Sequence, residues 1–155
     1  MVDFEEIYDL ALMEIVDYRL DKVANIDEER FMTVLLGWLT RGILEFSIVS
    51  ETPLDYVTEE VTEDDGEIRT KYYFVNDLQP LEKLILADLL VINWFENIVQ
   101  DVTQLNTHLS TKDFKSFSEA NNLKQKTMYL RELRSRYEAN VKALHFSNLT
   151  YEDLY

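Results

Sequence analysis

Cysteine is absent from this sequence, and its absence excludes disulfide bonds, thiol catalysis and every cysteine-ligated metal site. Glycine and proline are scarce, with 3 and 2 copies among 155 residues, which disfavours a turn-rich β-sandwich or barrel. The first residues, MVDFEEIYDL, lack a basic stretch followed by a long apolar stretch, so a signal peptide is not expected. The longest apolar run, 84–95, is too short to span a bilayer, and no membrane partner is expected.

Acidic residues dominate the composition, because 30 acids against 15 bases give a net charge of −15. Residues 1–80 hold 20 acids and 6 bases, a net charge of −14. Residues 81–155 hold 10 acids and 9 bases, a net charge of −1. Residues 112–142 alone hold 8 bases and 4 acids, a net of +4. Nucleic acid is disfavoured as a direct ligand, since its binding needs a basic patch. This uneven distribution of charge suits binding to protein partners of complementary charge, or it serves solubility alone.

Helix-capping signals predict where the first helices begin. Asp3 with Glu6 forms a capping box, and the apolar period that follows predicts a helix to about residue 24. Asp27 is the expected N-cap of a second helix that ends near residue 46. Gly37 and Gly42 lie inside this second helix, where each glycine costs about 1 kcal/mol against alanine. A close helix–helix or subunit contact at the two glycines is therefore predicted.

The second half of the chain is predicted to be helical as well. Pro80 suits the first position of a third helix, because its missing N–H costs nothing there, and this helix is expected to reach about residue 99. A short helix near 101–109 follows. Ser118 is the expected N-cap of a long basic helix, about 118–144. Residues 1–144 are expected to form one domain, and residues 145–155 a C-terminal tail.

A β-hairpin is expected at about 55–75. Two runs rich in Tyr, Val, Thr and Phe flank an Asp-Gly pair at 65–66, which is a type I′ turn signal. With this pair as the loop, Glu60 faces Lys71, and opposite charges favour an antiparallel ladder at facing positions. The predicted fold class is therefore mainly α: a helical bundle of four to five helices with a long C-terminal helix and one inserted β-hairpin.

Catalytic signatures are missing from the sequence. His108 and His145 have no third ligand type at metal-binding spacing, and the sequence contains no phosphate-binding loop and no GxSxG or GxGxxG motif. No serine has a base at a readable spacing. We therefore expect no enzyme, no catalytic residues, no metal and no cofactor. An enzyme of unrecognised type stays open, because it would need a polar pocket that sequence does not reveal.

The candidate functional residues are instead contact residues. A group of cations on the long basic helix lies along one flank, either for docking on an acidic partner or as a solvated face. Tail aromatics fill no predicted core position, so they suit a partner contact or simple disorder. The predicted contacts with a partner protein or a neighbouring subunit are Lys124, Arg131, Arg134, Phe146, Tyr151 and Tyr155, and the predicted hairpin contacts are Tyr56, Tyr72 and Tyr73.

Three stretches resemble the head-to-tail connector, or neck, proteins of tailed phages that infect Gram-positive bacteria. The most specific is 109–136, LSTKDFKSFSEANNLKQKTMYLRELRSR, followed by 35–46, LLGWLTRGILEF, and 76–96, NDLQPLEKLILADLLVINWFE. Together they cover about half of the chain in the family's order. The hairpin at about 55–75 is longer than the connection expected in this family.

This resemblance implies a virion structural protein, made in the host cytoplasm and located in the neck. Its copies would form a ring beneath the portal protein and next to other neck or tail proteins, and this ring is expected to be dodecameric. DNA would pass through the lumen without sequence-specific binding, because acidic walls repel phosphates. The alternative from another class is a small acidic regulatory or anti-host protein that mimics DNA.

Overall fold

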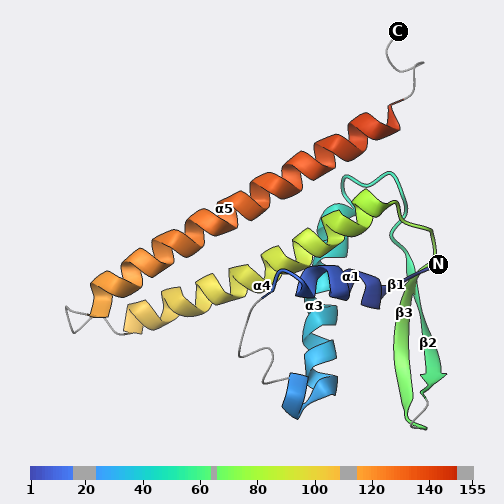
Figure 1. Ribbon diagram of the computed structural model, residues 1–155, viewed down its shortest axis with the longest axis horizontal. Helices are drawn as coiled ribbons and strands as arrows, with labels where there is room; N and C mark the ends of the chain where they lie inside the picture. Colours follow the sequence, from blue (N-terminus) through green and yellow to red (C-terminus); the bar gives the residue numbers. More distant parts are fainter. Residues whose placement is uncertain (16–23, 64–65, 109–114, 150–155) are drawn as a thin grey trace. The chain divides into compact units, whose positions relative to one another are not determined.

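The computed structural model describes residues 1–15, 24–63, 66–108 and 115–149, and the side chains of 101–122 lie outside that description (Figure 1). Helices make up most of it, which confirms the mainly α class. The chain divides into two compact units, Met1–Leu90 and Val91–Tyr155, where the sequence suggested one domain over 1–144. Among the described residues, no helix is long and apolar enough to cross a membrane.

The first helix, α1 (Phe4–Leu12), begins as the capping box predicts. The Asp3 carboxylate accepts a hydrogen bond from the Glu5 N–H at 3.0 Å, and the Glu6 carboxylate accepts one from the backbone of Asp3. The expected end near residue 24 is wrong, because α1 ends at Leu12, and residues 16–23 lie outside the description. Ile15 is buried although it follows the helix, so the apolar period marked burial and not helix continuation.

Helix α3 (Glu28–Phe46) has the predicted N-cap, since the Asp27 carboxylate accepts a hydrogen bond from the Arg30 N–H at 2.9 Å. Gly42 is buried in this helix, whereas Gly37 is exposed, and a Cβ added to Gly37 meets no atom within 4 Å. Within the described chain, the predicted helix–helix contact at Gly37 is therefore wrong, whereas the alternative contact with another subunit stays a prediction. A glycine with open space around it is a position where backbone freedom is lost without a packing gain.

A three-stranded antiparallel sheet holds the predicted hairpin. Strands β2 (Tyr56–Thr62) and β3 (Ile68–Phe74) pair along their whole length, and β1 (Val2–Asp3) adds to the other side of β3 in the order β1-β3-β2. Strand β1 was not predicted, because two residues before a helix cap carry no strand signal of their own. It is defined only by its pairing with β3.

The predicted register of the hairpin is wrong by one residue. Lys71 faces Glu59, and Glu60 faces Thr70. The Glu63 N–H donates to the Glu67 carbonyl and the Gly66 N–H donates to the Glu63 carbonyl, each at 2.9 Å, and Gly66 has φ of +85°. The turn therefore lies between residues 63 and 67 and has one residue more than a two-residue loop. Three-residue loops with a left-handed final residue are a common hairpin form.

Helix α4 (Pro80–His108) begins with the predicted proline and runs through both units. Glu82 reaches back to accept a hydrogen bond from the Gln79 N–H at 2.7 Å, which completes half of a capping box. The separate helix expected near 101–109 is wrong, because α4 is continuous to His108 and contains no glycine and no proline after Pro80. Much of the buried apolar surface lies on this helix: Ile85, Leu86, Ala87, Leu89, Leu90, Val91, Ile92, Trp94 and Phe95.

Helix α5 (Lys115–Asn148) contains 34 residues, which corresponds to about 51 Å at 1.5 Å per residue. It starts before Ser118, so the prediction of Ser118 as N-cap is wrong, and this residue lies in the first turn. It also continues beyond the predicted end at 144, so the expected tail begins as helix. The stretch 115–148 contains no glycine and no proline, and nothing in its sequence forces the helix to stop earlier.

Alanine substitution of Gly37 and of Gly66 tests the helical conformation of the first and the left-handed conformation of the second, because both glycines have open space around them. Gly37→Ala should raise the free energy of unfolding by about 0.5–1 kcal/mol, because alanine is the better helix former and finds free space. Gly66→Ala should lower it by about 1–2 kcal/mol, because φ of +85° brings Cβ too close to the following carbonyl. Urea unfolding followed by circular dichroism measures both, and a destabilising Gly37→Ala would contradict the exposed position of Gly37.

Candidate partner-binding surfaces

The hairpin tyrosines of the first unit are placed by one buried ring. Phe4, with 1% of its surface exposed, lies 4.6 Å from Phe74, 5.2 Å from Tyr56 and 5.6 Å from Tyr72, measured between ring centroids. Tyr56 and Tyr72, both predicted as hairpin contacts, therefore have an internal packing role, and Tyr56 keeps 39% exposure. Tyr73, the third predicted contact, is half-buried and faces Asp3 of β1.

Ion pairs join the hairpin to the two helices beside it. Lys71 Nζ lies 3.3 Å from Glu63 and 3.5 Å from Glu5 of α1. The hydrogen bond to Glu63, with the charge of Glu5, raises the pKa of Lys71. Arg69 pairs with Glu28 of α3 at 3.0 Å and lies 3.6 Å from Glu67. Both cations of β3 are therefore engaged with carboxylates of the same unit.

Two further polar contacts connect the N-terminal part of the first unit to residues 77–83. Lys83 of α4 donates to the Glu6 carboxylate at 2.6 Å, and this hydrogen bond lowers the pKa of Glu6. The N-terminal ammonium donates to Asp77 at 2.8 Å and lowers the pKa of that carboxyl. Burial raises the pKa of Tyr8 on α1 above its usual range. These contacts hold β1 and α1 against the segment that leads into α4.

In the second unit, an aromatic and an ionic contact are among those that join α4 and α5. Phe95 and Tyr129 meet edge to face with ring centroids 5.0 Å apart. One turn further along α5, Arg134 Nη2 donates to the Glu96 carboxylate at 2.6 Å, and both side chains are mostly covered. Arg134, one of the predicted partner contacts, pairs with a carboxylate of its own unit, and its contact with a partner stays a prediction. Glu96 was missed because it lies 38 residues from Arg134 in the sequence.

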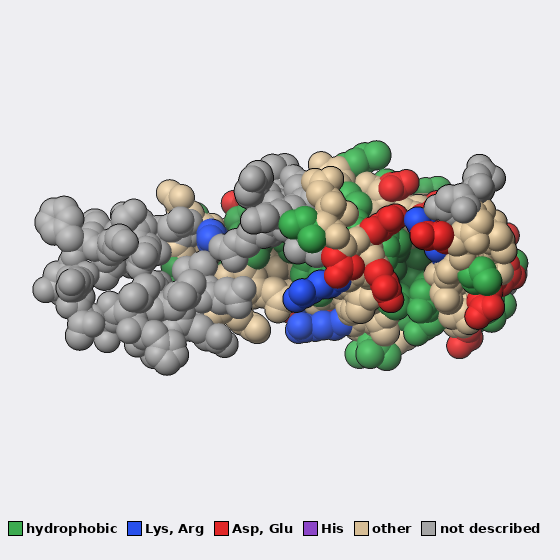
Figure 2. Space-filling view, turned by 90° about the horizontal axis from the view of Figure 1, so that it is seen from below, with side chains coloured by type: hydrophobic (Ala, Val, Ile, Leu, Met, Phe, Trp, Pro, Cys, Tyr) green, Lys and Arg blue, Asp and Glu red, His purple; other side chains and the backbone are tan. Residues whose placement is uncertain are grey.

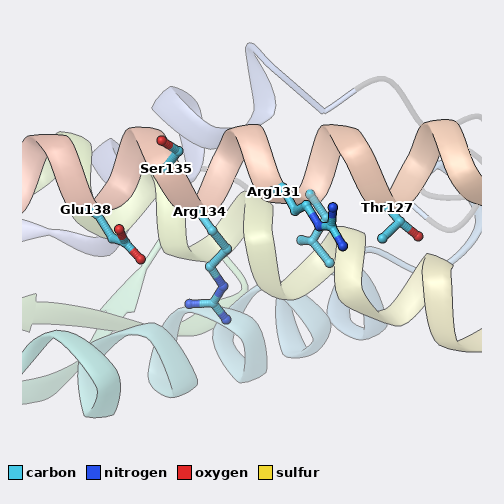
Figure 3. A pocket seen from close by; sticks show the side chains of 6 residues that line it. Thr127, Arg131, Arg134, Ser135 and Glu138 are labelled. Carbon is cyan, nitrogen blue, oxygen red and sulfur yellow. The ribbon is translucent and has the colours of Figure 1, made fainter.

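The flank of α5 beside this contact forms a pocket of about 530 Å³ (Figure 3). Figure 3 shows the side chains of Thr127, Arg131, Arg134 and Glu138 extending from the same side of the helix. The Arg131 guanidinium and the Glu138 carboxylate suit polar recognition of another chain, and the lining contains no histidine that could activate Ser135. The lining residues are Thr127, Leu130, Arg131, Arg134, Ser135 and Glu138.

The other predicted contact residues of the long helix are exposed where the structure describes them. Lys124 and Arg131 are exposed and lie seven residues apart, so they share one side of α5. Phe146 has 73% of its surface exposed near the end of the helix. Tyr151 and Tyr155 lie outside the described residues. Leu133 and Leu144 are buried, and they lie on the side of α5 opposite Lys124 and Arg131.

Charge separates between the two units. The first unit holds 22 acids and 7 bases, a net of −15, and the second holds 8 of each. Red carboxylate side chains are spread over the face shown in Figure 2, with few blue cations among them. Within the described chain, no group of three or more potential ligands could hold a metal ion. The surfaces therefore offer charge recognition as their main chemistry.

The two arginines of the pocket make a matched pair for mutation. Arg134→Met should lower the free energy of unfolding by about 0.5–1 kcal/mol, because it removes a partly covered ion pair. Arg131→Met should change it by less than about 0.5 kcal/mol, because that side chain is exposed. Urea unfolding of both variants measures the difference. Equal effects of the two substitutions would contradict the assignment of Arg134 to the Glu96 contact.

Comparison with known proteins finds no matching family model, no similar curated protein and no similar solved structure. The resemblance to phage connector proteins stays a prediction from the sequence. Its three stretches fall on α3, on the start of α4 and, for residues 115–136, on α5, while 109–114 lie outside the described residues.

Proposed function

We propose that this chain is a structural subunit of a phage neck: a head-to-tail connector whose copies form a ring under the portal protein and extend the DNA channel. The observation that carries the proposal is the long α5 helix. It contains most of the stretch that resembles the connector family, and its exposed cations and exposed terminal aromatic have no role in the described core. Such a helix is suited to docking between proteins of an assembly.

The proposed docking surface follows one helix from Lys124 through Arg131 to Phe146. These residues span about 33 Å at 1.5 Å per residue, a length suited to a standard protein–protein interface. Arginine and aromatic side chains are the residue types that most often dominate interface energies. The portal protein would therefore present carboxylates to the two cations and an apolar recess to Phe146.

The distribution of charge supports a role beside passing DNA. All of the net charge of −15 lies in the first unit. Carboxylates around a channel repel DNA phosphates, so the genome would slide through without binding. We propose that the first unit lines the channel or meets the next neck layer.

A DNA-mimicking anti-host protein is the alternative, and its carboxylates would have to be spaced like phosphates. On the hairpin the acidic residues do not form an unbroken array, because Arg69 pairs with Glu67 and Lys71 pairs with Glu63. Each cation also pairs with a carboxylate of a neighbouring helix. The mimic would also leave the exposed cations and Phe146 of α5 without a purpose. The connector is therefore the better supported role.

Co-expression with the portal protein encoded in the same genome tests the proposal, with electron microscopy and native mass spectrometry of the purified complex. We expect a ring of this chain stacked on the portal. Lys124→Glu/Arg131→Glu should reduce the portal-bound fraction at least about tenfold, because two attractive contacts become repulsive. The control Lys124→Arg/Arg131→Lys keeps both charges and should leave the complex intact.

Two results would contradict the connector role or the docking surface assigned to it. One is a chain that remains monomeric and does not bind the portal, which would direct attention to basic host proteins. The other is a portal complex that is equally stable with the charge-reversed and the charge-preserving variants, which would exclude this flank of α5 as the docking surface.

A further inference from the structure

Strand β2 forms an outer edge of the sheet in the first unit. It lies on the side of β3 opposite β1, and Figure 1 shows it at the outside of the sheet. Six of its seven residues are exposed, and the seventh, Val61, is half-buried. An exposed edge strand offers a row of backbone donors and acceptors on which another extended chain can pair. The edge is therefore a candidate interaction surface that no described strand occupies.

The hydrogen bonds of the hairpin identify which backbone groups point outward. Asp55 and Glu63 bond to β3 partners, Asp55 accepting from the Val75 N–H and Glu63 donating to the Glu67 carbonyl. Because backbone groups alternate along an antiparallel strand, the odd-numbered residues between them also face β3. The N–H and C=O groups on the outer edge are those of Tyr56, Thr58, Glu60 and Thr62.

Two adjacent carboxylates mark the middle of this edge. The side chains of Glu59 and Glu60 are exposed on opposite faces of the strand, and neither carboxylate forms a hydrogen bond or an ion pair with another described residue. Lys71, which faces Glu59, is engaged by Glu63 and Glu5. The edge therefore carries negative charge that the hairpin's own cations do not neutralise.

This charge decides which strand can pair with β2. A second copy pairing antiparallel about the strand centre would bring Glu59 and Glu60 of both chains together, and like charges at facing positions are destabilising. A strand with basic residues at these positions is favoured. We propose that the β2 edge binds an extended, basic segment of a partner protein, which adds a fourth strand to the sheet.

The register of β2 specifies the segment. An antiparallel partner that faces Val61, Glu60, Glu59, Thr58 and Val57 in turn needs the pattern apolar, basic, basic, polar, apolar. Val57 keeps 42% exposure, so an apolar partner residue gains contact area there. Backbone hydrogen bonds give such a complex affinity, and alternate side chains give it specificity. The proposal does not depend on the connector role.

A synthetic peptide tests the proposal with the full-length protein. The peptide is capped at both ends and centred on Val-Lys-Lys-Thr-Val, and binding is followed by amide chemical shifts and amide hydrogen exchange in NMR spectra. In the free protein the outward amides of Thr58 and Glu60 should exchange fast and those of Glu59 and Val61 slowly. Saturating peptide should slow exchange at Thr58 and Glu60 at least about tenfold, because these amides become strand-bonded.

Matched substitutions distinguish the contribution of backbone hydrogen bonds to peptide binding from the contribution of charge. Replacing both peptide lysines with glutamate should weaken binding at least about tenfold, and Glu59→Lys/Glu60→Lys in the protein should restore binding of that peptide. Thr58→Pro removes an outward N–H, so it should weaken binding while circular dichroism stays unchanged. Edge strands accept proline where the N–H faces solvent.

Three results would overturn the proposal. One is no binding at millimolar peptide. Another is binding without slower exchange at Thr58 and Glu60, which would mean that charge attracts the peptide without strand pairing. The third is slow exchange of these two amides in the protein alone that depends on protein concentration, which would identify a second copy as the occupant.

Discussion

The burial of the Phe4 ring is the contact on which the first unit depends. Phe4 is the first residue of α1, directly after the two residues of β1, and its ring lies among Tyr8, Tyr56, Tyr72 and Phe74. An isolated two-stranded hairpin is marginally stable in water. Here the hairpin gains a third strand and an aromatic cluster from the same short N-terminal segment. The position of the β2 edge, and hence the surface that it offers, follows from this one packing arrangement.

The second unit is built differently, from two helices joined by the Phe95–Tyr129 and Glu96–Arg134 contacts. The two contacts use one side of α5 and leave Lys124, Arg131 and Phe146 to the surface. The molecule thus combines an acidic unit that presents a strand edge with a neutral unit that presents a cationic helix flank. Two chemically distinct surfaces on one chain suit a protein that contacts more than one neighbour.

Features that depend on residues close together in the sequence were predicted correctly, whereas features that depend on residues far apart in the sequence were not. Asp3, Asp27 and Pro80 start helices as expected, because a cap is satisfied within the next few residues. The hairpin was predicted correctly, but its predicted register was wrong by one residue, because one additional turn residue moves every pair. The β1 strand and the Arg134–Glu96 contact could not be predicted, since each joins residues far apart in the sequence.

Amide hydrogen exchange of a Phe4→Ala variant tests the central role of this ring most directly, with Phe146→Ala as a control that removes an equally large but exposed ring. Removing a buried phenylalanine costs about 3–5 kcal/mol. We expect Phe4→Ala to speed exchange first and most at the β3-facing amides of Val57, Glu59 and Val61, while α5 amides keep their wild-type rates. Phe146→Ala should leave the hairpin unchanged. Hairpin amides that stay protected in Phe4→Ala would contradict the account.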